Sequence, residues 1–141
     1  MTPEEQKKIA IAYVTHIADG GIDEKHIAHD MVAWSLSSGD MPKAAYWPRL
    51  KHVKAIFTTP LKMTIDDITQ VQDRVFVQSH SHGHLYTGDV YSNDYLFILD
   101  FNAQGQIRRA REYFNVDKLR ATLMPALLKW EAENLVRNHG P

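Results

Sequence analysis

Hydrophobic and polar residues alternate in three long runs of the C-terminal half, residues 75–86, 91–101 and 107–115. A period of two places successive side chains on opposite faces, which predicts three β-strands. Residues 102–106 have the composition of a hairpin turn, with Gly105 where a positive φ angle is needed, so the flanking strands should pair antiparallel. Both faces of the middle run carry apolar residues, and we therefore expect both faces to be covered.

A fourth, less regular strand is expected before these three. Met63, Ile65 and Ile68 belong to an alternating pattern that Asp66 and Asp67 interrupt. An extra residue in such a strand forms a β-bulge, in which two residues face one residue of the neighbouring strand. The pattern therefore predicts a bulged strand, and it makes the two aspartates part of the bulge rather than a catalytic pair of acids.

The N-terminal half begins with helical spacing. Thr2, Pro3 and Glu5 form a capping box with proline in the first turn. Apolar residues then recur every three or four positions until Gly20-Gly21, where we expect the first helix to end.

The segment from Asp23 to Pro60 changes its pattern three times. Asp23 is suited to cap a short second helix through Ala28, and residues 31–36 have the composition of a short strand. From Tyr46 the apolar residues return at helical spacing until Pro60, which predicts a third helix of about a dozen residues.

A last helix is expected after the strands. Asp117 is suited to cap it, and Pro125 should kink or restart it because proline has no backbone N–H. The apolar positions of this helix are Leu119, Leu123, Leu127 and Trp130.

Length and charge limit the possible functions. The 141 residues suffice for one domain, residues 1–141, with a hydrophobic core. The 16 Lys and Arg nearly balance the 17 Asp and Glu, so there is no basic face for phosphate backbones and we expect no nucleic-acid partner. The absence of cysteine excludes disulfides, thiolate zinc sites and cysteine nucleophiles.

The N-terminal residues do not have the composition of a targeting segment. Met1–Gln6 is acidic, whereas a signal peptide would be basic and then apolar. No stretch of the sequence approaches the roughly 20 apolar residues of a membrane span. We therefore expect a cytoplasmic protein without a membrane partner.

The closing segment, Arg111-Glu112-Tyr113-Phe114-Asn115, carries a family resemblance together with residues 91–101, Gly105 and Ile107. With the preceding helices and strands, this hairpin resembles that of the SnoaL-like polyketide cyclases, over roughly residues 5–118. These cyclases belong to the superfamily of nuclear transport factor 2, ketosteroid isomerase and limonene epoxide hydrolase. The resemblance implies an α+β fold, in which a curved antiparallel sheet forms a cone around the N-terminal helix and a C-terminal helix follows.

The resemblance also implies a role for Glu112. The segment 111–115 is similar to the Arg-Asp-Tyr-Phe-Asp ending of limonene epoxide hydrolases, in which the first acid is catalytic, and Glu112 takes that position. Those hydrolases carry an additional Arg-x-Asp pair, whereas this chain has His80-Ser81-His82 in the corresponding region, so epoxide hydrolysis is not expected. Polyketide cyclases combine an acid with a histidine and a tyrosine of the first helix, which implies roles for His80 or His82 and for Tyr13.

The residues themselves leave alternatives open. Glu112 shares a strand face with Ala110 and Phe114, and a carboxylate among aromatic walls loses hydration, which raises its pKa towards that of a general acid or base. It could equally form an ordinary ion pair with Arg109 or Arg111, or lie on a solvated outer face.

Three histidines, His80, His82 and His84, stand two residues apart and therefore share one strand face. They could move a proton, orient a substrate, bind a metal or simply be solvated, and we favour no metal because a metal site of the His-x-His type needs an all-β double sheet and further ligands. A one-residue shift in register would exchange Glu112 for Tyr113 or Asn115 in the pocket.

The walls of small-molecule pockets are mostly apolar, with a few polar groups at defined positions. The predicted strands and helices both contain residues that could form such a wall. The expected pocket residues are Trp34, Gln78, Tyr95, Phe97 and Phe114. These residues could also be simple core, and Tyr46 and Trp47 are expected in the core or at a dimer surface.

We therefore expect an isomerase, cyclase or lyase that needs no cofactor and applies acid–base chemistry to a small hydrophobic ligand. Glu112 would be the acid or base, His80 or His82 would relay or orient a proton, and Tyr13 would donate a hydrogen bond to a substrate oxygen. The alternative is a non-catalytic ligand-binding or dimerisation module of the same fold. The apolar residues on both faces of 91–101 predict a homodimer.

Overall fold

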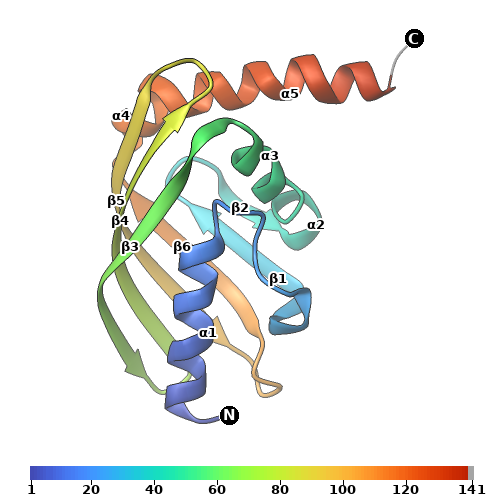
Figure 1. Ribbon diagram of the computed structural model, residues 1–141. Helices are drawn as coiled ribbons and strands as arrows, with labels where there is room; N and C mark the ends of the chain where they lie inside the picture. Colours follow the sequence, from blue (N-terminus) through green and yellow to red (C-terminus); the bar gives the residue numbers. More distant parts are fainter. Residues whose placement is uncertain (140–141) are drawn as a thin grey trace.

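The computed structural model describes residues 1–139, with side chains through residue 135. A six-stranded, strongly curved sheet has the strand order β2-β1-β6-β5-β4-β3 (Figure 1). The strands are β1 (Ile27–Ser35), β2 (Gly39–Pro42), β3 (Phe57–Val71), β4 (Arg74–Leu85), β5 (Val90–Phe101) and β6 (Ile107–Phe114).

Helices lie against the concave side and across one end of this sheet (Figure 1). α1 packs against β3, β4 and β5, whereas α5 crosses the end near α3 and extends beyond the sheet. The helical segments are α1 (Pro3–His16), η1 (Glu24–His26), α2 (Lys43–Tyr46), α3 (Arg49–Ala55), α4 (Val116–Lys118), η2 (Leu119–Leu123) and α5 (Met124–His139). The predicted α+β cone is therefore confirmed.

The three long C-terminal strands follow the predicted pattern closely. β4 pairs antiparallel with β5, and β5 pairs antiparallel with β6. Gly105 in the β5–β6 turn has a φ angle of 76°, which glycine adopts without a steric penalty. The predicted bulge is also present, because the β3–β4 register shifts between Ile65 and Asp67.

The predicted third helix is wrong in extent. Residues 46–60 contain the end of α2, a turn, α3 and the start of β3, and Pro60 lies inside β3 instead of ending a helix. A proline is tolerated there because β3 is at the edge of the sheet, where no further strand needs its missing N–H. The helical spacing of the apolar residues was correct only within α3.

The first strand is longer than predicted, and it makes the only parallel pairing among the described strands. Asp23 caps a short 3₁₀ helix, η1, as expected, but this helix ends at His26 and not at Ala28, because β1 begins at Ile27. Its register with β6 shifts between Ile27 and Val32, and this irregularity hides the alternation from the sequence. Because β1 and β6 are parallel, Ser35 lies beside Glu112.

The ends of the first and last helices also differ from prediction. α1 ends at His16, before the predicted Gly20-Gly21. Asn115 caps α4 by accepting a hydrogen bond from the Lys118 amide, so the expected cap, Asp117, is two residues too late. A π-helical turn, η2, precedes Pro125, which lies in the first turn of α5 and restarts the helix as expected.

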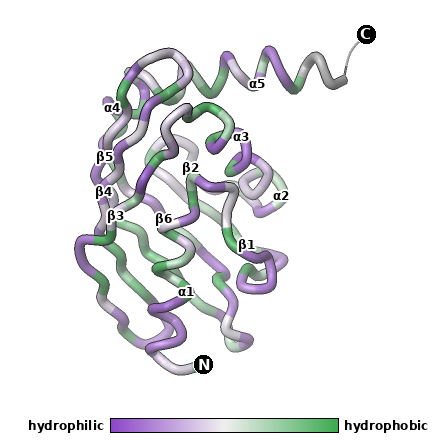
Figure 2. The backbone as a smooth tube through the Cα atoms, in the orientation of Figure 1, coloured by the Kyte–Doolittle hydropathy of each residue, from purple (hydrophilic) through white to green (hydrophobic). Residues whose placement is uncertain are grey.

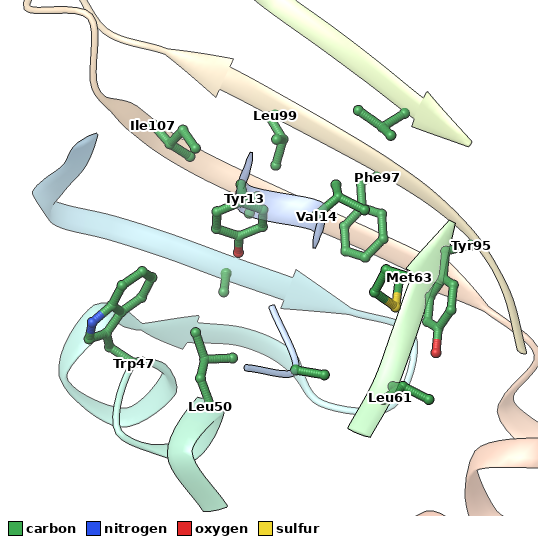
Figure 3. Close-up of a cluster of buried hydrophobic side chains, with 14 of the residues drawn as sticks. Tyr13, Val14, Trp47, Leu50, Leu61, Met63, Tyr95, Phe97, Leu99 and Ile107 are labelled. Carbon is green, nitrogen blue, oxygen red and sulfur yellow. The ribbon is translucent and has the colours of Figure 1, made fainter. Parts of the chain in front are cut away.

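The core fills the space between the concave face of the sheet and the helices. Hydrophobic and hydrophilic residues alternate along the strands (Figure 2), and the burial patterns of β4 and β5 show that the hydrophobic set is the buried one. Side chains from α1, α3, β3, β5 and β6 converge in one cluster (Figure 3). None of the helices within residues 1–139 is long and apolar enough to cross a membrane.

Candidate functional site

A cavity of about 160 Å³ lies between the concave face of the sheet and the helices. Most of its wall is apolar, with side chains from α1, α3, β3 and the segment from β6 to α5. The apolar lining includes Ile17, Ala33, Met41, Leu50, Val53, Leu61, Met63, Phe97, Ala110, Phe114, Leu119, Leu123, Met124 and Leu127. The polar lining consists of Tyr13, Ser35, Ser37, Ser38, Tyr46, Arg49, Tyr91, Tyr95 and Glu112.

Glu112 lines this cavity from β6, on the same strand face as Ala110 and Phe114. Burial among apolar groups disfavours its charged form and raises the pKa of the carboxyl to about 7. Part of the side chain remains accessible because it faces the cavity instead of packed atoms. No side chain through residue 135 donates a hydrogen bond to its carboxyl group or forms an ion pair with it.

The two arginines that flank Glu112 are engaged elsewhere. Arg109 contacts Asp40 at 3.2 Å, and Arg111 approaches Asp100 at 3.9 Å. Both alternate with Glu112 along β6 and therefore belong to the convex face of the sheet. An ion pair within β6 is thus not the reason for the position of Glu112, and the register predicted for the closing strand is the one observed.

Tyr13 and Tyr46 form the polar pair opposite the sheet. Their hydroxyl oxygens lie 2.7 Å apart, which is a hydrogen bond of normal length. Burial raises the pKa of both phenols, and the nearby negative charge of Glu112 adds to this rise. Both hydroxyls therefore stay protonated near neutral pH. Figure 3 shows the ring of Tyr13 reaching from α1 into the cluster.

Two further tyrosines, Tyr91 and Tyr95, line the cavity from β5. Burial raises the pKa of each, and the charge of Glu112 contributes to both increases. Tyr95 is held by a 2.9 Å hydrogen bond to the Ser81 hydroxyl, and Tyr91 accepts a 2.8 Å hydrogen bond from the Asn93 amide. These bonds fix the rings, so the wall around Glu112 is rigid and aromatic.

The predicted placement of His80, His82 and Gln78 in the pocket is wrong. All three are exposed on the convex face of β4, and His80 binds the Asp66 carboxylate at 2.8 Å. The physical reason is the alternation of the strand: Val75, Val77 and Leu85 are buried inside, so the intervening serines share their face and the histidines point outward.

Of the other expected pocket residues, Phe97, Tyr95 and Phe114 line the cavity, and the Tyr95 and Phe97 rings stack at 5.5 Å. Trp34 is also at the cavity wall, but its indole ring packs 5.0 Å from the ring of Tyr113. Tyr113 alternates with Glu112 along β6, so the indole ring lies on the convex face and not inside the cavity.

Several lining residues were not predicted from the sequence. Tyr46 was expected in the core or at a dimer surface, and its contact with Tyr13 joins residues 33 positions apart. Arg49 and the serines 35, 37 and 38 carry no motif, and they reach the cavity only because the β1–β2 turn and α3 fold over it. Only the short alternation from Met31 to Ser35, after the irregular part of β1, could have indicated Ser35.

Histidine and carboxylate side chains do not gather into a metal site. Within the described part of the chain, no three His, Asp or Glu side chains are placed to hold a metal ion together. The ionisable lining of the cavity consists of Glu112, Arg49 and the four tyrosines. This arrangement supplies one carboxyl group that can exchange a proton near neutral pH and several neutral hydroxyl donors.

Comparison with solved structures confirms the fold, whereas sequence comparison finds no relatives. No protein-family model matches the sequence, and no curated protein matches it. The pinacolase BvnE from Penicillium brevicompactum is similar with a TM-score of 0.70 and 16% identity, over 92% of each chain. An epoxide hydrolase of the limonene type from M. tuberculosis has a TM-score of 0.64 and 12% identity, over 95% of this chain and 97% of its own.

A third structure carries the superfamily name. It is a nuclear transport factor 2-like protein of unknown function from Cytophaga hutchinsonii, with a TM-score of 0.62 and 12% identity, over 82% of this chain and 100% of its own. The structural neighbours thus include a nuclear transport factor 2-like protein and an epoxide hydrolase of the limonene type, two groups that the sequence resemblance named.

Proposed function

We propose that this protein is an isomerase, cyclase or lyase that moves a proton on a small hydrophobic carbonyl compound without a cofactor. The observation that supports this proposal is Glu112, a carboxyl group with a pKa of about 7 in an apolar cavity. A group with this pKa is present in both protonation states near neutral pH, which suits it to take a proton and return it.

The chemistry follows from the groups around Glu112. Its carboxylate removes a proton from the carbon next to the substrate carbonyl, and the electron pair of that C–H bond moves into an enolate. The hydroxyl pair of Tyr13 and Tyr46 donates a hydrogen bond to the enolate oxygen, which carries the developing charge. Protonated Glu112 then returns the proton to carbon, so the number of protons is conserved.

Paired tyrosines are well suited to this task. One hydroxyl donates to the other, which leaves the accepting hydroxyl with its own hydrogen free for the substrate. Hydrogen bonds in a chain polarise one another, so this free donor is stronger than an isolated phenol. Because both phenols remain neutral, neither competes with Glu112 for the proton.

The cavity volume limits the size of the substrate. A cavity of about 160 Å³ is similar to engineered cavities of about 150 Å³ that hold benzene. The closed part of the site therefore fits one or two rings, and larger molecules would extend through the opening.

Hydrogen–deuterium exchange of 2-tetralone, a two-ring ketone, tests the proposal. The protein should speed the exchange of its α-hydrogens in D₂O, followed by NMR, and Glu112→Gln should reduce this acceleration by about 10²- to 10⁴-fold. His80→Gln, on the convex face, is the matched control and should exchange at the wild-type rate. An unchanged rate in folded Glu112→Gln protein would remove Glu112 from the mechanism.

The alternative is a receptor that binds a ligand in the same cavity without converting it. It is favoured by the isolation of Glu112, which has no second acid or histidine among the described cavity-lining residues. NMR titration of the labelled carboxyl group distinguishes the two functions. A pKa near 7 that shifts when a ketone binds supports chemistry, whereas binding of 2-tetralone without any exchange supports the receptor.

We further propose a homodimer formed through the convex face of the sheet. Trp34, Phe76, Leu96, Ile98 and Tyr113 point to this side and are only partly covered, although their side chains are apolar or aromatic. Partly covered apolar and aromatic side chains on one face are typical of an interface. Light scattering at micromolar concentration should give twice the chain mass, and Tyr113→Glu should halve it; a monomeric wild-type protein would contradict the dimer.

A further inference from the structure

Arg49 differs from every other side chain that lines the cavity. Among the lining residues that the structure describes, it is the only basic one, and Glu112 is the only acidic one. The Arg49 side chain is 31% exposed, and the Glu112 side chain is also partly accessible. No ion pair joins these two side chains, so Arg49 and Glu112 lie at separate places on the cavity wall.

The Arg49 guanidinium is held by a residue of α5. Its Nε donates to Glu131 Oε2 at 3.2 Å, and its Nη2 donates to Glu131 Oε1 at 3.0 Å. This two-bond contact is the preferred geometry between arginine and a carboxylate, and it fixes the plane of the guanidinium. His52 Nδ1 is 2.8 Å from Glu131 Oε2, and the His52 ring lies 5.4 Å from the Trp130 ring.

The remaining edge of this guanidinium is free to bind something else. Among the side chains described, through residue 135, none accepts a hydrogen bond from Nη1 of Arg49. A guanidinium carries five N–H donors, and the contact with Glu131 uses only one edge of the group. Glu131 does not line the cavity but Arg49 does, so the edge away from Glu131 is the one that borders it.

The charges of the cluster suit an oxygen acceptor. Burial raises the pKa of the Glu131 carboxyl, but the hydrogen bonds and charges of Arg49 and His52 outweigh this effect and keep the pKa below its usual range. Glu131 is therefore charged at neutral pH and balances Arg49. The free edge then offers strong donors without a large unbalanced charge, which fits a ketone oxygen as well as a carboxylate.

We propose that Arg49 is a specificity-determining residue that donates through its free edge to an oxygen of the substrate. Glu131 and His52 act through Arg49, as positioning residues. The inference rests on the proposed binding of a small hydrophobic molecule in this cavity, and it adds a second requirement to that molecule. The substrate is a one- or two-ring compound with two oxygen atoms, one at the Tyr13–Tyr46 pair and the other at Arg49.

Binding of three matched naphthalenes tests this inference. 2-Acetylnaphthalene carries a ketone oxygen, 2-naphthoate carries a carboxylate, and 2-methylnaphthalene carries no oxygen. At least one of the oxygenated ligands should bind the wild-type protein about 10-fold or more tighter than 2-methylnaphthalene, because a hydrogen bond to a charged group is among the stronger ones. Whichever binds more tightly identifies the acceptor as a ketone or a carboxylate.

Substitution of Arg49 should remove this preference. Arg49→Met keeps the unbranched apolar stem, so 2-methylnaphthalene should bind it as it binds the wild type, while the oxygenated ligands lose their advantage. Arg108→Met, at an exposed position of β6, is the matched control and should keep the wild-type ranking. A preference retained in folded Arg49→Met protein overturns the inference.

A second measurement keeps the test decisive if Arg49→Met does not fold. In the wild-type protein, the Nε–H signal of Arg49 in ¹⁵N NMR should move when an oxygenated ligand is added and stay in place with 2-methylnaphthalene. Equal shifts with all three ligands overturn the inference. Glu131→Gln should reduce the preference for oxygenated ligands less than Arg49→Met does, because Glu131 acts only through Arg49. If the Arg49–Glu131 pair were purely structural, Glu131→Gln would change stability and leave the ranking of the ligands unaltered.

These outcomes separate the inference from the proposed function. Glu112→Gln should retain the Arg49-dependent preference, because Arg49 is held by Glu131 and makes no ion pair with Glu112. If the protein exchanges 2-tetralone but binds the three naphthalenes equally, only the role of Arg49 is refuted. If none of the three ligands binds, the small-molecule site itself is refuted, and the role of Arg49 with it.

Discussion

The concave and convex faces of the sheet carry titratable groups in opposite circumstances. Glu112 faces inward from β6, without an ionic partner among the described side chains, and burial raises its pKa to about 7. His80 faces outward from β4, where it pairs with Asp66 and both side chains are about half exposed, at 49% and 45%. Whether a titratable group can take part in chemistry therefore depends on whether it lies on the face of the sheet that the helices cover, and not on the type of residue.

The polar residues of the two faces differ in the same way. Ser81 and Asn93 are buried on the concave face and hold Tyr95 and Tyr91 in place through hydrogen bonds. On the convex face, polar side chains such as Gln78 are exposed to water. Polar groups inside therefore order the wall of the cavity, whereas those outside mainly keep the surface hydrated.

The largest difference between the faces should appear on removing a phenylalanine from each. Phe97 is 1% exposed on the concave face, and Phe76 is only partly covered on the convex face. Phe97→Ala should lower the free energy of unfolding by about 3–5 kcal/mol, and Phe76→Ala by about 1 kcal/mol. Urea denaturation measures both values, and equal losses would contradict the division into a packed face and an open face.

A pH series should reveal the burial of Glu112 directly. Its pKa is about 7 in the folded protein against a reference value of 4.5, so the folded state binds the proton more tightly. The stability that this proton provides is complete below about pH 4.5 and falls by about 3 kcal/mol as the pH rises through about 7. Glu112→Gln should lack this loss, measured as the free energy of unfolding at each pH.

The difference between wild type and Glu112→Gln is the quantity to follow. Other groups titrate equally in both proteins, so subtraction leaves the contribution of Glu112. If that difference stays constant between about pH 4.5 and 7.5, the carboxyl is not held in an apolar environment.

Removing one hydroxyl from each face should have a smaller effect. Tyr13→Phe leaves the Tyr46 hydroxyl without its partner inside the protein and should cost about 1–2 kcal/mol. Tyr113 is 36% exposed on the convex face, so Tyr113→Phe should cost less than about 0.5 kcal/mol. Thermal unfolding of both variants checks the contrast, and a larger loss for Tyr113→Phe would reverse it.

The smallest effect is expected for the exposed pair of His80 and Asp66. Pairs in water gain little because solvent screens them, and His80→Gln should change the free energy of unfolding by less than about 1 kcal/mol. Chemical denaturation at neutral pH measures the change. A loss above about 2 kcal/mol would show that this part of the convex face is covered in solution, as in a dimer.

Much of the C-terminal half could be predicted because apolar and polar residues alternate regularly along its strands. The three long strands, the Gly105 turn and the bulge near Asp66 depend on neighbours a few residues apart. The same alternation placed Glu112 with Ala110 and Phe114 on one face. The segment from Asp23 to Pro60 was harder to predict. Its helices and strands are short, and one strand is irregular, so no spacing of apolar residues continues long enough to identify an element.

The candidate site was predicted only where one strand or helix sufficed to define it. Glu112 and Phe97 follow from strand patterns together with the family resemblance. Tyr46 and Arg49 do not, because the first meets Tyr13 across 33 residues and the second is held by Glu131 across 82 residues. Contacts of this range leave no periodic signal in a single sequence.

The sequence by itself determined the strands, their turns and the pairs of residues that share a face, because a period of two or 3.6 is a local property of the backbone. Only the tertiary structure decided which face of β4 points inward, and so excluded His80 and His82 from the cavity. That choice depends on which side α1 and α5 cover, since burying Val75 and Val77 is more favourable than burying histidines.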